Sequence, residues 1–250
     1  MPNLSTADAI YLGSTPVTAV HVGATKVWPL GFDPLSVAGC QLWLDAADAS
    51  TITHSGGAVS QWDDKSGNTR HTTQGTAGRK PTTGTATIGG RNVLVFDGGD
   101  VLLTPTLTLA QPVTIYVVAR LTNTGVGNGQ MIGNTGNSPT IYAGNAITNY
   151  WRLYAGKDVP SAVVTDSTAH QFTAIFNGVS SFLYLDGTAI LSNVNPGTPG
   201  WSSKAIPIGA GPTASVGWPG EVAEVLIYDT ALGTTDRQAI ESYLATKWGL

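Results

Sequence analysis

Residues 171–191, QFTAIFNGVSSFLYLDGTAIL, predict a three-stranded antiparallel meander. In the first run Phe172, Ala174 and Phe176 share one face, as in a half-buried strand. The pairs Asn177-Gly178 and Asp186-Gly187 separate this run from two further alternating runs, and both pairs are strong signals for tight hairpin turns. The stretch therefore favours an antiparallel β protein.

The sequence on either side of this meander extends the β pattern. Residues 113–120 are almost all apolar, which is typical of a strand in the centre of a sandwich. The only convincing helix follows the last strand: Thr234 can cap it, Gly249 can end it, and Ile240, Tyr243, Leu244 and Trp248 form one apolar stripe. We expect an all-β, two-sheet antiparallel sandwich with one C-terminal helix. Further strands are expected at 41–45, 58–62, 92–97 and 221–229.

The first thirty residues contain a short repeat. Residues 10–17 and 20–27 share one pattern, in which an apolar run meets a Gly-small-Thr turn and then resumes. Such a ribbon of hairpins has too few residues to bury a core of its own, so we expect it to pack on the following domain, a sister chain or a larger assembly. Because Pro and Gly cluster over 28–34, we predict an attachment ribbon at 1–30 and a β domain at 31–250.

Composition excludes several classes of protein. Only 11% of the 250 residues are charged, against about 25% in an average soluble protein, and the formal net charge is −4. Lysine and arginine are scattered singly, which argues against a nucleic-acid surface. No apolar run is long enough to span a membrane, and the N-terminus lacks the pattern of a signal peptide. Cys40 is the only cysteine, so neither an intrachain disulfide nor a cysteine zinc site is expected.

Four motifs, in their order along the chain, carry a family resemblance. They are residues 42–46 (LWLDA), 62–68 (WDDKSGN), 96–98 (FDG) and 220–228 (GEVAEVLIY), the last followed by a short helix. This order resembles the concanavalin A-like, laminin G-like jelly-roll domains. The resemblance implies a sandwich of two antiparallel sheets and, commonly, carbohydrate or adhesive binding.

The repeat at 10–28 is similar to the N-terminal segment of bacteriophage and prophage tail proteins. This resemblance implies a minor tail or tail-tip protein of the virion, made in the host cytoplasm and assembled as a homotrimer with other tail or baseplate proteins. Its jelly roll would attach to a host-surface glycan. The alternatives are a purely structural tail component without glycan binding and an endoglycanase.

Glycosidase chemistry finds little support in the sequence. Sugar hydrolysis usually needs two carboxylates facing one another across the scissile bond. Glu221 and Glu224 are three residues apart, which on a regular strand points them to opposite faces. We therefore name no catalytic residue and expect no enzyme activity.

Sugar binding needs aromatic faces together with planar amides, guanidinium groups or carboxylates. Residues 149–154 offer that mixture in Asn149, Trp151, Arg152 and Tyr154, although Trp151 and Tyr154 are equally compatible with the core. Trp201 lies in a Gly- and Pro-rich segment and is the foremost surface candidate. The sixth candidate is Trp218, beside the last motif.

Calcium is the one cofactor that the sequence suggests. This ion takes several oxygen ligands from loops, and Asp45, Asp64 and Asp97 end strands in Gly- and Ser-rich turns. Laminin G-like domains often hold calcium at the rim of the sandwich. The alternative is that Asp64 and Asp97 only cap their own turns.

Overall fold

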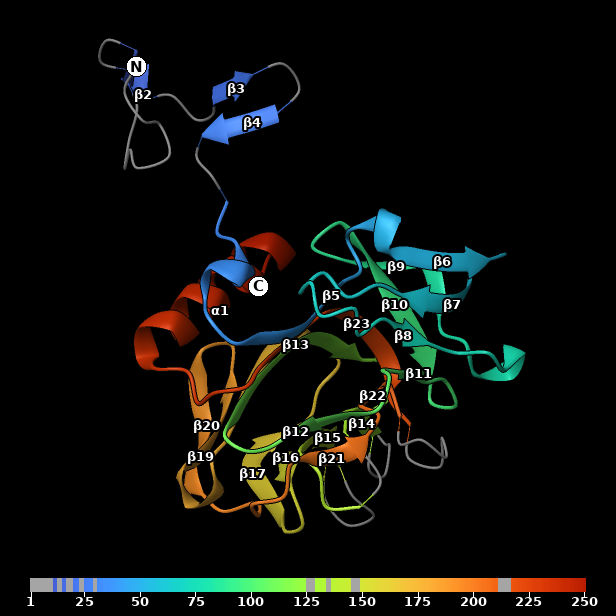
Figure 1. The fold of residues 1–250 in the computed structure, drawn as a ribbon, viewed down its shortest axis with the longest axis vertical. Coiled ribbons are helices and arrows are strands. Elements are labelled where there is room, and N and C mark those ends of the chain that lie inside the picture. Colours follow the sequence, from blue (N-terminus) through green and yellow to red (C-terminus); the bar gives the residue numbers. More distant parts are fainter. Residues whose placement is uncertain are drawn as a thin grey trace. The chain divides into compact units, whose positions relative to one another are not determined.

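The computed structural model describes residues 31–124, 129–133, 136–144, 149–210 and 217–250, together with four short strands before residue 30 (Figure 1). The chain divides into two compact units, Met1–Ser36 and Val37–Leu250. No helix among the described residues is long and apolar enough to cross a membrane.

The first unit contains the two predicted hairpins. Strand β1 (Tyr11–Leu12) pairs antiparallel with β2 (Thr15–Pro16), and β3 (Val20–Val22) pairs antiparallel with β4 (Thr25–Trp28). The paired strands expected in each repeat are thus confirmed; the rest of each repeat, the turn residues included, lies outside the described residues. The attachment role of the ribbon stays a prediction.

The second unit is built around β13 (Val113–Leu121). This strand pairs along its length with β18 (Ala169–Phe176) on one side and β23 (Pro219–Tyr228) on the other. The meander continues from β18 through β19 (Ser181–Leu185) to β20 (Thr188–Val194), which confirms the prediction for 171–191. On its side away from β13, β23 pairs with β5 (Cys40–Asp45) and with β10 (Arg91–Asp97).

A second layer faces the first (Figure 1). It contains β14 (Gly129–Ile132), β15 (Thr140–Ala143), β16 (Tyr150–Tyr154) and β17 (Asp158–Val164), paired in that order. On the side away from β15, β14 pairs with β22 (Pro207–Ile208), and β22 pairs in turn with β11 (Leu102–Leu103). Strand β12 (Leu107–Leu109) pairs separately with β21 (Trp201–Lys204).

The two layers are not separate sheets, which differs from the expected sandwich. Strand β7 (Ala58–Trp62) pairs with β6 (Ile52–Ser55), with β8 (Thr72–Thr73) and with β9 (Thr82–Ile88). Because β8 joins β11 and β9 joins β10, hydrogen bonding runs from one layer into the other. The result is one large, strongly curved antiparallel sheet that nearly closes on itself.

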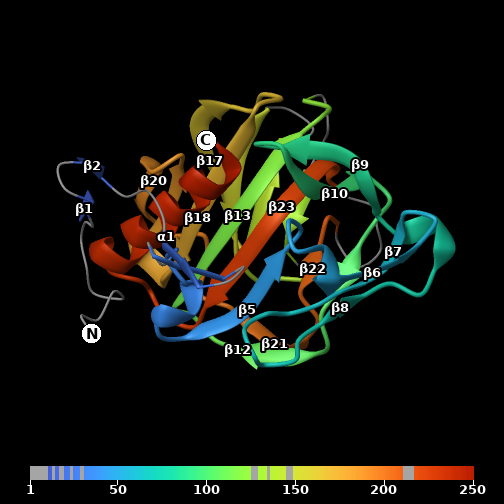
Figure 2. The same ribbon diagram turned by 90° about the horizontal axis from the view of Figure 1, so that it is seen from above.

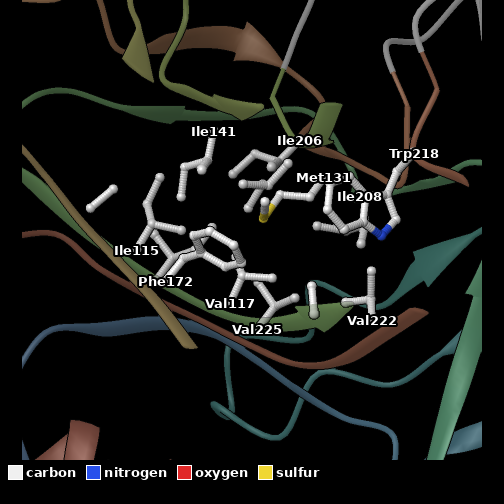
Figure 3. Close-up of a cluster of buried hydrophobic side chains, with 14 of the residues drawn as sticks. Ile115, Val117, Met131, Ile141, Phe172, Ile206, Ile208, Trp218, Val222 and Val225 are labelled. Atoms are coloured by element: carbon white, nitrogen blue, oxygen red, sulfur yellow. The ribbon is translucent and has the colours of Figure 1, made fainter. Parts of the chain in front are cut away.

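The core lies between the facing halves of this curved sheet (Figure 3). Ile115 and Val117 of β13 point toward Met131 and Ile141 of the other layer (Figure 3). All four side chains are fully buried. The period-two alternation of the strands thus places apolar side chains in one continuous interior.

Helix α1 (Thr234–Trp248) lies against β18 on the outer side of the first layer (Figure 2). Ile240, Leu244 and Trp248 are fully buried, and Gly249 ends the helix at a φ of 70°. The expected cap at Thr234 is wrong: the N-cap residue is Gly233, which has no side chain to accept a hydrogen bond. Short 3₁₀ turns occur at Pro34–Ser36, Ala49–Thr51, Ala77–Arg79 and Gly178–Ser180.

Candidate functional site

Strands β15, β16 and β17 bring polar and aromatic side chains together on the outer face of the second layer. Tyr142 stands opposite Arg152, and Tyr154 stands opposite Asp158. Because side chains alternate along a strand, Trp151 and Leu153 point into the core while their neighbours point outward. We call the outward set the tyrosine–arginine face; its members are Asn137, Tyr142, Tyr150, Arg152, Tyr154 and Asp158.

An ionic group lies at the centre of this face. The Arg152 guanidinium and the Tyr142 hydroxyl both donate hydrogen bonds to the Asp158 carboxylate. Arg152 is only 3% exposed, whereas the Asp158 side chain is 42% exposed. Burial, and next the hydrogen bond to Asp158, raise the pKa of Tyr142, so its hydroxyl remains a donor. The face therefore offers a carboxylate held in one orientation by two buried donors.

Tyr154 and Asn137 lie beside this ionic group. The Tyr154 hydroxyl donates to the Asn137 side-chain oxygen over 2.9 Å, and Tyr154 is half-buried while Asn137 is exposed. Gly156 in the adjoining turn has a φ of 102°, a left-handed conformation that favours glycine, and it lies next to Asn137. A partly exposed phenol ring, an amide and a carboxylate are the groups that contact the apolar and hydroxyl faces of a sugar.

The face unites some of the candidates from the sequence and adds others. Arg152 and Tyr154 lie on it, and exposed Asn149 lies at the start of β16. Tyr142, Asp158 and Asn137 were missed. Tyr142 and Asp158 come from neighbouring strands whose register no local pattern reveals, and Asn137 comes from a turn. The single tyrosine in residues 140–143 was the one sequence signal that could have pointed to Tyr142.

The tryptophan candidates lie in the core. The expectation that Trp201 is exposed is wrong: it is 1% exposed because β21 pairs with β12, which places Leu109 opposite it. Trp151 and Trp218 are also fully buried, with 6.4 Å between their ring centroids. A fully buried indole has no free face for a ligand at the surface, so these three residues are core residues rather than binding residues.

The three aspartates do not gather into one site. Asp64 accepts hydrogen bonds from the amides of Trp43 at 3.0 Å and Ser66 at 2.9 Å, and Asp97 accepts from Gly99 at 2.7 Å, so the capping alternative is confirmed for both. Asp45 instead forms ion pairs, with Lys65 at 3.0 Å and Lys247 at 2.8 Å. Across the described ranges there is no group of three or more His, Cys, Asp or Glu side chains that could hold a metal ion. The calcium set expected from sequence is therefore not assembled.

The two glutamates of β23 share a face, contrary to expectation. Glu221 stands opposite Arg120, and Glu224 stands opposite Val118, with a register shift between them. This bulge inserts one residue into β23 and so restores both side chains to the outer side. Each carboxylate is engaged: Glu221 pairs with Arg120, and Glu224 lies 2.7 Å from the Lys247 ammonium.

The curved antiparallel sheet and the single C-terminal helix define the class of this protein, an antiparallel β domain. The family model of the concanavalin A-like lectin/glucanases superfamily matches residues 96–236, more than half of the chain. The chain belongs to this superfamily. No curated protein sequence matches it.

Solved structures with a similar fold include several with sugars bound. A sialidase from Trypanosoma rangeli, in complex with difluorosialic acid, is similar with a TM-score of 0.60 and 14% identity over 98% of this chain. The chain spans only 37% of that sialidase. Domain 4 of the extracellular arabinanase AbnA of Geobacillus stearothermophilus, in complex with arabinotriose, is similar with a TM-score of 0.58 and 13% identity, over 80% of this chain and 96% of that one.

A third similar structure is the binding domain of the Paraclostridial mosquitocidal protein 1. It has a TM-score of 0.59 and 13% identity, over 86% of this chain and 53% of that one. At such identities the likeness concerns the fold alone.

Proposed function

We propose that this protein is a non-catalytic glycan-binding module that uses the tyrosine–arginine face. The observation that carries the proposal is the Asp158 carboxylate, oriented by Arg152 and Tyr142 beside the half-buried ring of Tyr154. The carboxylate and the Asn137 amide would bond to sugar hydroxyls, and the Tyr154 ring would cover the C–H face of a sugar unit.

The similar structures support a carbohydrate ligand and suggest where to begin. The AbnA domain 4 structure contains arabinotriose, and a similar arabinofuranosidase structure contains arabinofuranosyl-xylobiose. Pentose oligosaccharides are therefore reasonable first probes.

The finer proposal concerns the biological setting. The 10–28 repeat resembles tail-protein segments, and on this ground we propose a bacteriophage minor tail or tail-tip protein that attaches the virion to a host-surface glycan. Several weak sites in a homotrimer, joined to other tail proteins through the ribbon, would turn modest affinity into avidity. This setting rests on the sequence resemblance only.

The test is binding of the full chain to arabino-oligosaccharides and to a panel of bacterial envelope polysaccharides, by glycan array and then calorimetry. Tyr154→Ala should abolish retention, because it removes the ring and its bond to Asn137. Tyr154→Phe should keep most of it, because it removes only the hydroxyl. The matched control is Tyr184→Ala, since Tyr184 is also half-buried but lies on β19.

Circular dichroism and the melting temperature would show that each variant is folded. Retention that is lost with Tyr154→Ala but kept with Tyr184→Ala supports the proposal. Absence of binding to every glycan, for the assembled protein as well, would favour a purely structural role. Release of shortened glycans from any of the ligands would contradict the non-catalytic assignment.

A further inference from the structure

The tyrosine–arginine face continues along the seam between β16 and β17, beyond the ionic group that carries the proposed function. The two strands lie side by side (Figure 1). Because Trp151 and Leu153 belong to the core, the residues that alternate with them on β16 point outward, as do the residues opposite those on β17. Three outward pairs therefore follow one another along the seam. They are Tyr154 with Asp158, Arg152 with Pro160, and Tyr150 with Val164.

The pair farthest from Asp158 is apolar and open to solvent. Val164 is 59% exposed, and its partner Tyr150 is half-buried. In the middle pair Pro160 is exposed as well, whereas Arg152 is almost fully covered and its guanidinium is bonded to Asp158. From the middle to the far end, the surface of β17 along the seam is thus hydrocarbon.

The seam is longer than one sugar ring. Tyr150 and Tyr154 are four residues apart on one face of β16, so at about 3.3 Å per residue their Cα atoms are about 13 Å apart. A register shift beside Tyr150 gives β17 additional length at that end and adds exposed Ala162 to the apolar surface. A monosaccharide that covers one tyrosine ring therefore does not reach the other.

The two ends of the seam offer different chemistry. Beside Tyr154, the Asp158 carboxylate accepts hydrogen bonds, so a sugar unit there is recognised through its hydroxyl groups. Beside Tyr150, the Val164 side chain has no hydrogen-bonding group, so a unit there is held by packing of its C–H surface on the phenol ring and the valine methyls. The first end determines which sugar binds, and the second adds affinity only for a chain long enough to reach it.

We propose that the ligand of this face is a linear oligosaccharide, a trisaccharide or longer. Its anchoring unit lies at Tyr154 and Asp158, and its distant unit packs on Tyr150 and Val164. This inference rests on the proposed glycan-binding function and adds to it the length of the ligand and a separate role for each end of the seam.

The test is a calorimetric titration of the full chain with arabinose, arabinobiose and arabinotriose, a series that the AbnA domain 4 complex suggests. Arabinotriose should bind about tenfold more tightly than arabinose, a difference of about 1.4 kcal/mol. If the glycan panel selects another sugar, the monomer, dimer and trimer of that sugar form the series. Equal affinity for monomer and trimer overturns this inference and leaves glycan binding in place. Absence of binding to every glycan overturns both.

The variant Tyr150→Ala removes the distant contact. The ratio of the affinities for arabinotriose and arabinose should fall from about tenfold to about one, because only the longer sugar reaches this residue. Tyr150→Phe keeps the ring and should keep the ratio. The matched control is Tyr184→Ala, since Tyr184 is also half-buried but lies on β19, and it too should keep the ratio. Circular dichroism and the melting temperature show that each variant is folded.

The exposed valines provide a second matched pair. Val164→Ala should lower the same ratio in part, whereas Val179→Ala should leave it unchanged, because Val179 is 67% exposed but lies in the turn before β19. Tyr154→Ala should instead abolish the binding of monomer and trimer alike. The inference is overturned if a folded Tyr150→Ala protein keeps the tenfold ratio, or if Val164→Ala and Val179→Ala behave alike.

Discussion

The carboxylate of Glu224 on β23 accepts a hydrogen bond from the indole nitrogen of Trp248 on α1, with 2.7 Å between the two atoms. The same carboxylate accepts from the indole of Trp43 at 2.7 Å and from the Tyr243 hydroxyl at 2.9 Å. The ammonium of Lys247 lies 2.7 Å away. One fully buried carboxylate therefore joins α1 to two strands of the sheet through three hydrogen bonds and one ion pair.

Replacement of Glu224 by Gln should destabilise the domain by about 3 kcal/mol, because the charge of Lys247 and two indole N–H groups lose an anionic acceptor in the interior. Urea unfolding followed by tryptophan fluorescence measures the loss. Glu221→Gln is the matched control on the same strand. Its partner Arg120 is 33% exposed, so water can replace the lost interaction and the loss should be smaller. Equal losses for the two variants would contradict the central role of Glu224.

Trp201→Ala should lower stability by about 3–5 kcal/mol, the usual range for removal of a fully buried aromatic side chain. The structure places this indole in the core, so the variant should report on folding and not on ligand contact. Val179, which is 67% exposed, offers the contrasting case, and Val179→Ala should change stability by less than about 0.5 kcal/mol. A Trp201→Ala protein with an unchanged melting temperature would show that the indole is not a core residue.

The difference between Trp201 and the meander shows what local sequence could predict. Alternation and the Asn-Gly and Asp-Gly turns act within a few residues, so the strands of 171–191 followed from sequence alone. The burial of Trp201 depends on pairing with Leu109, far away in the chain, which no local pattern contains. To predict the tyrosine–arginine face, one would have to know the register of β15 against β16. To predict the shared face of Glu221 and Glu224, one would have to know that β23 contains a bulge. Both features are set by tertiary packing.

Asp100→Asn should stabilise the protein at neutral pH. Burial raises the pKa of Asp100 to about 6, and the nearby charge of Asp97 adds to the effect. When the pKa of a carboxyl is raised in the folded state, the protein becomes less stable as the pH rises from about 4 through 6. The reason is that the folded state disfavours the charged form of this carboxyl. An amide carries no such penalty and can still accept the bond that the Asp97 amide donates at 3.0 Å. With allowance for screening by water near the surface, the gain at pH 7 should be about 1 kcal/mol.

The pH itself is the control for this variant. At about pH 3 and below, the carboxyl is protonated in both the folded and the unfolded state, so the gain should vanish there. Thermal unfolding of both proteins between about pH 3 and pH 8 measures how the gain changes. A gain that is independent of pH would assign the effect to another cause.

His170 should contribute stability with the opposite pH dependence. Burial alone would lower the pKa of its ring, but the hydrogen bonds to Asp186 and Asp166 outweigh it and hold the pKa above the ordinary value of 6.5. The folded state therefore binds the proton more tightly than the unfolded state does. The resulting stabilisation is complete below about pH 6.5 and is lost as the pH rises through the raised value. Thermal or urea unfolding should show the largest advantage over His170→Gln near pH 5.5, with a decline toward pH 8.5.

The neighbouring carboxyl group of Asp166 does not titrate within this pH range. The hydroxyl and amide of Thr168 lower the pKa of Asp166 against the effect of burial, so this group stays ionised throughout it. The variant Asp166→Asn provides an independent check, because removal of one anionic partner should move the pH at which His170 loses its proton downward. NMR titration of the imidazole measures that pH directly. A midpoint at or below 6.5 in the unmodified protein, or one that Asp166→Asn leaves in place, would contradict an imidazolium held between two carboxylates.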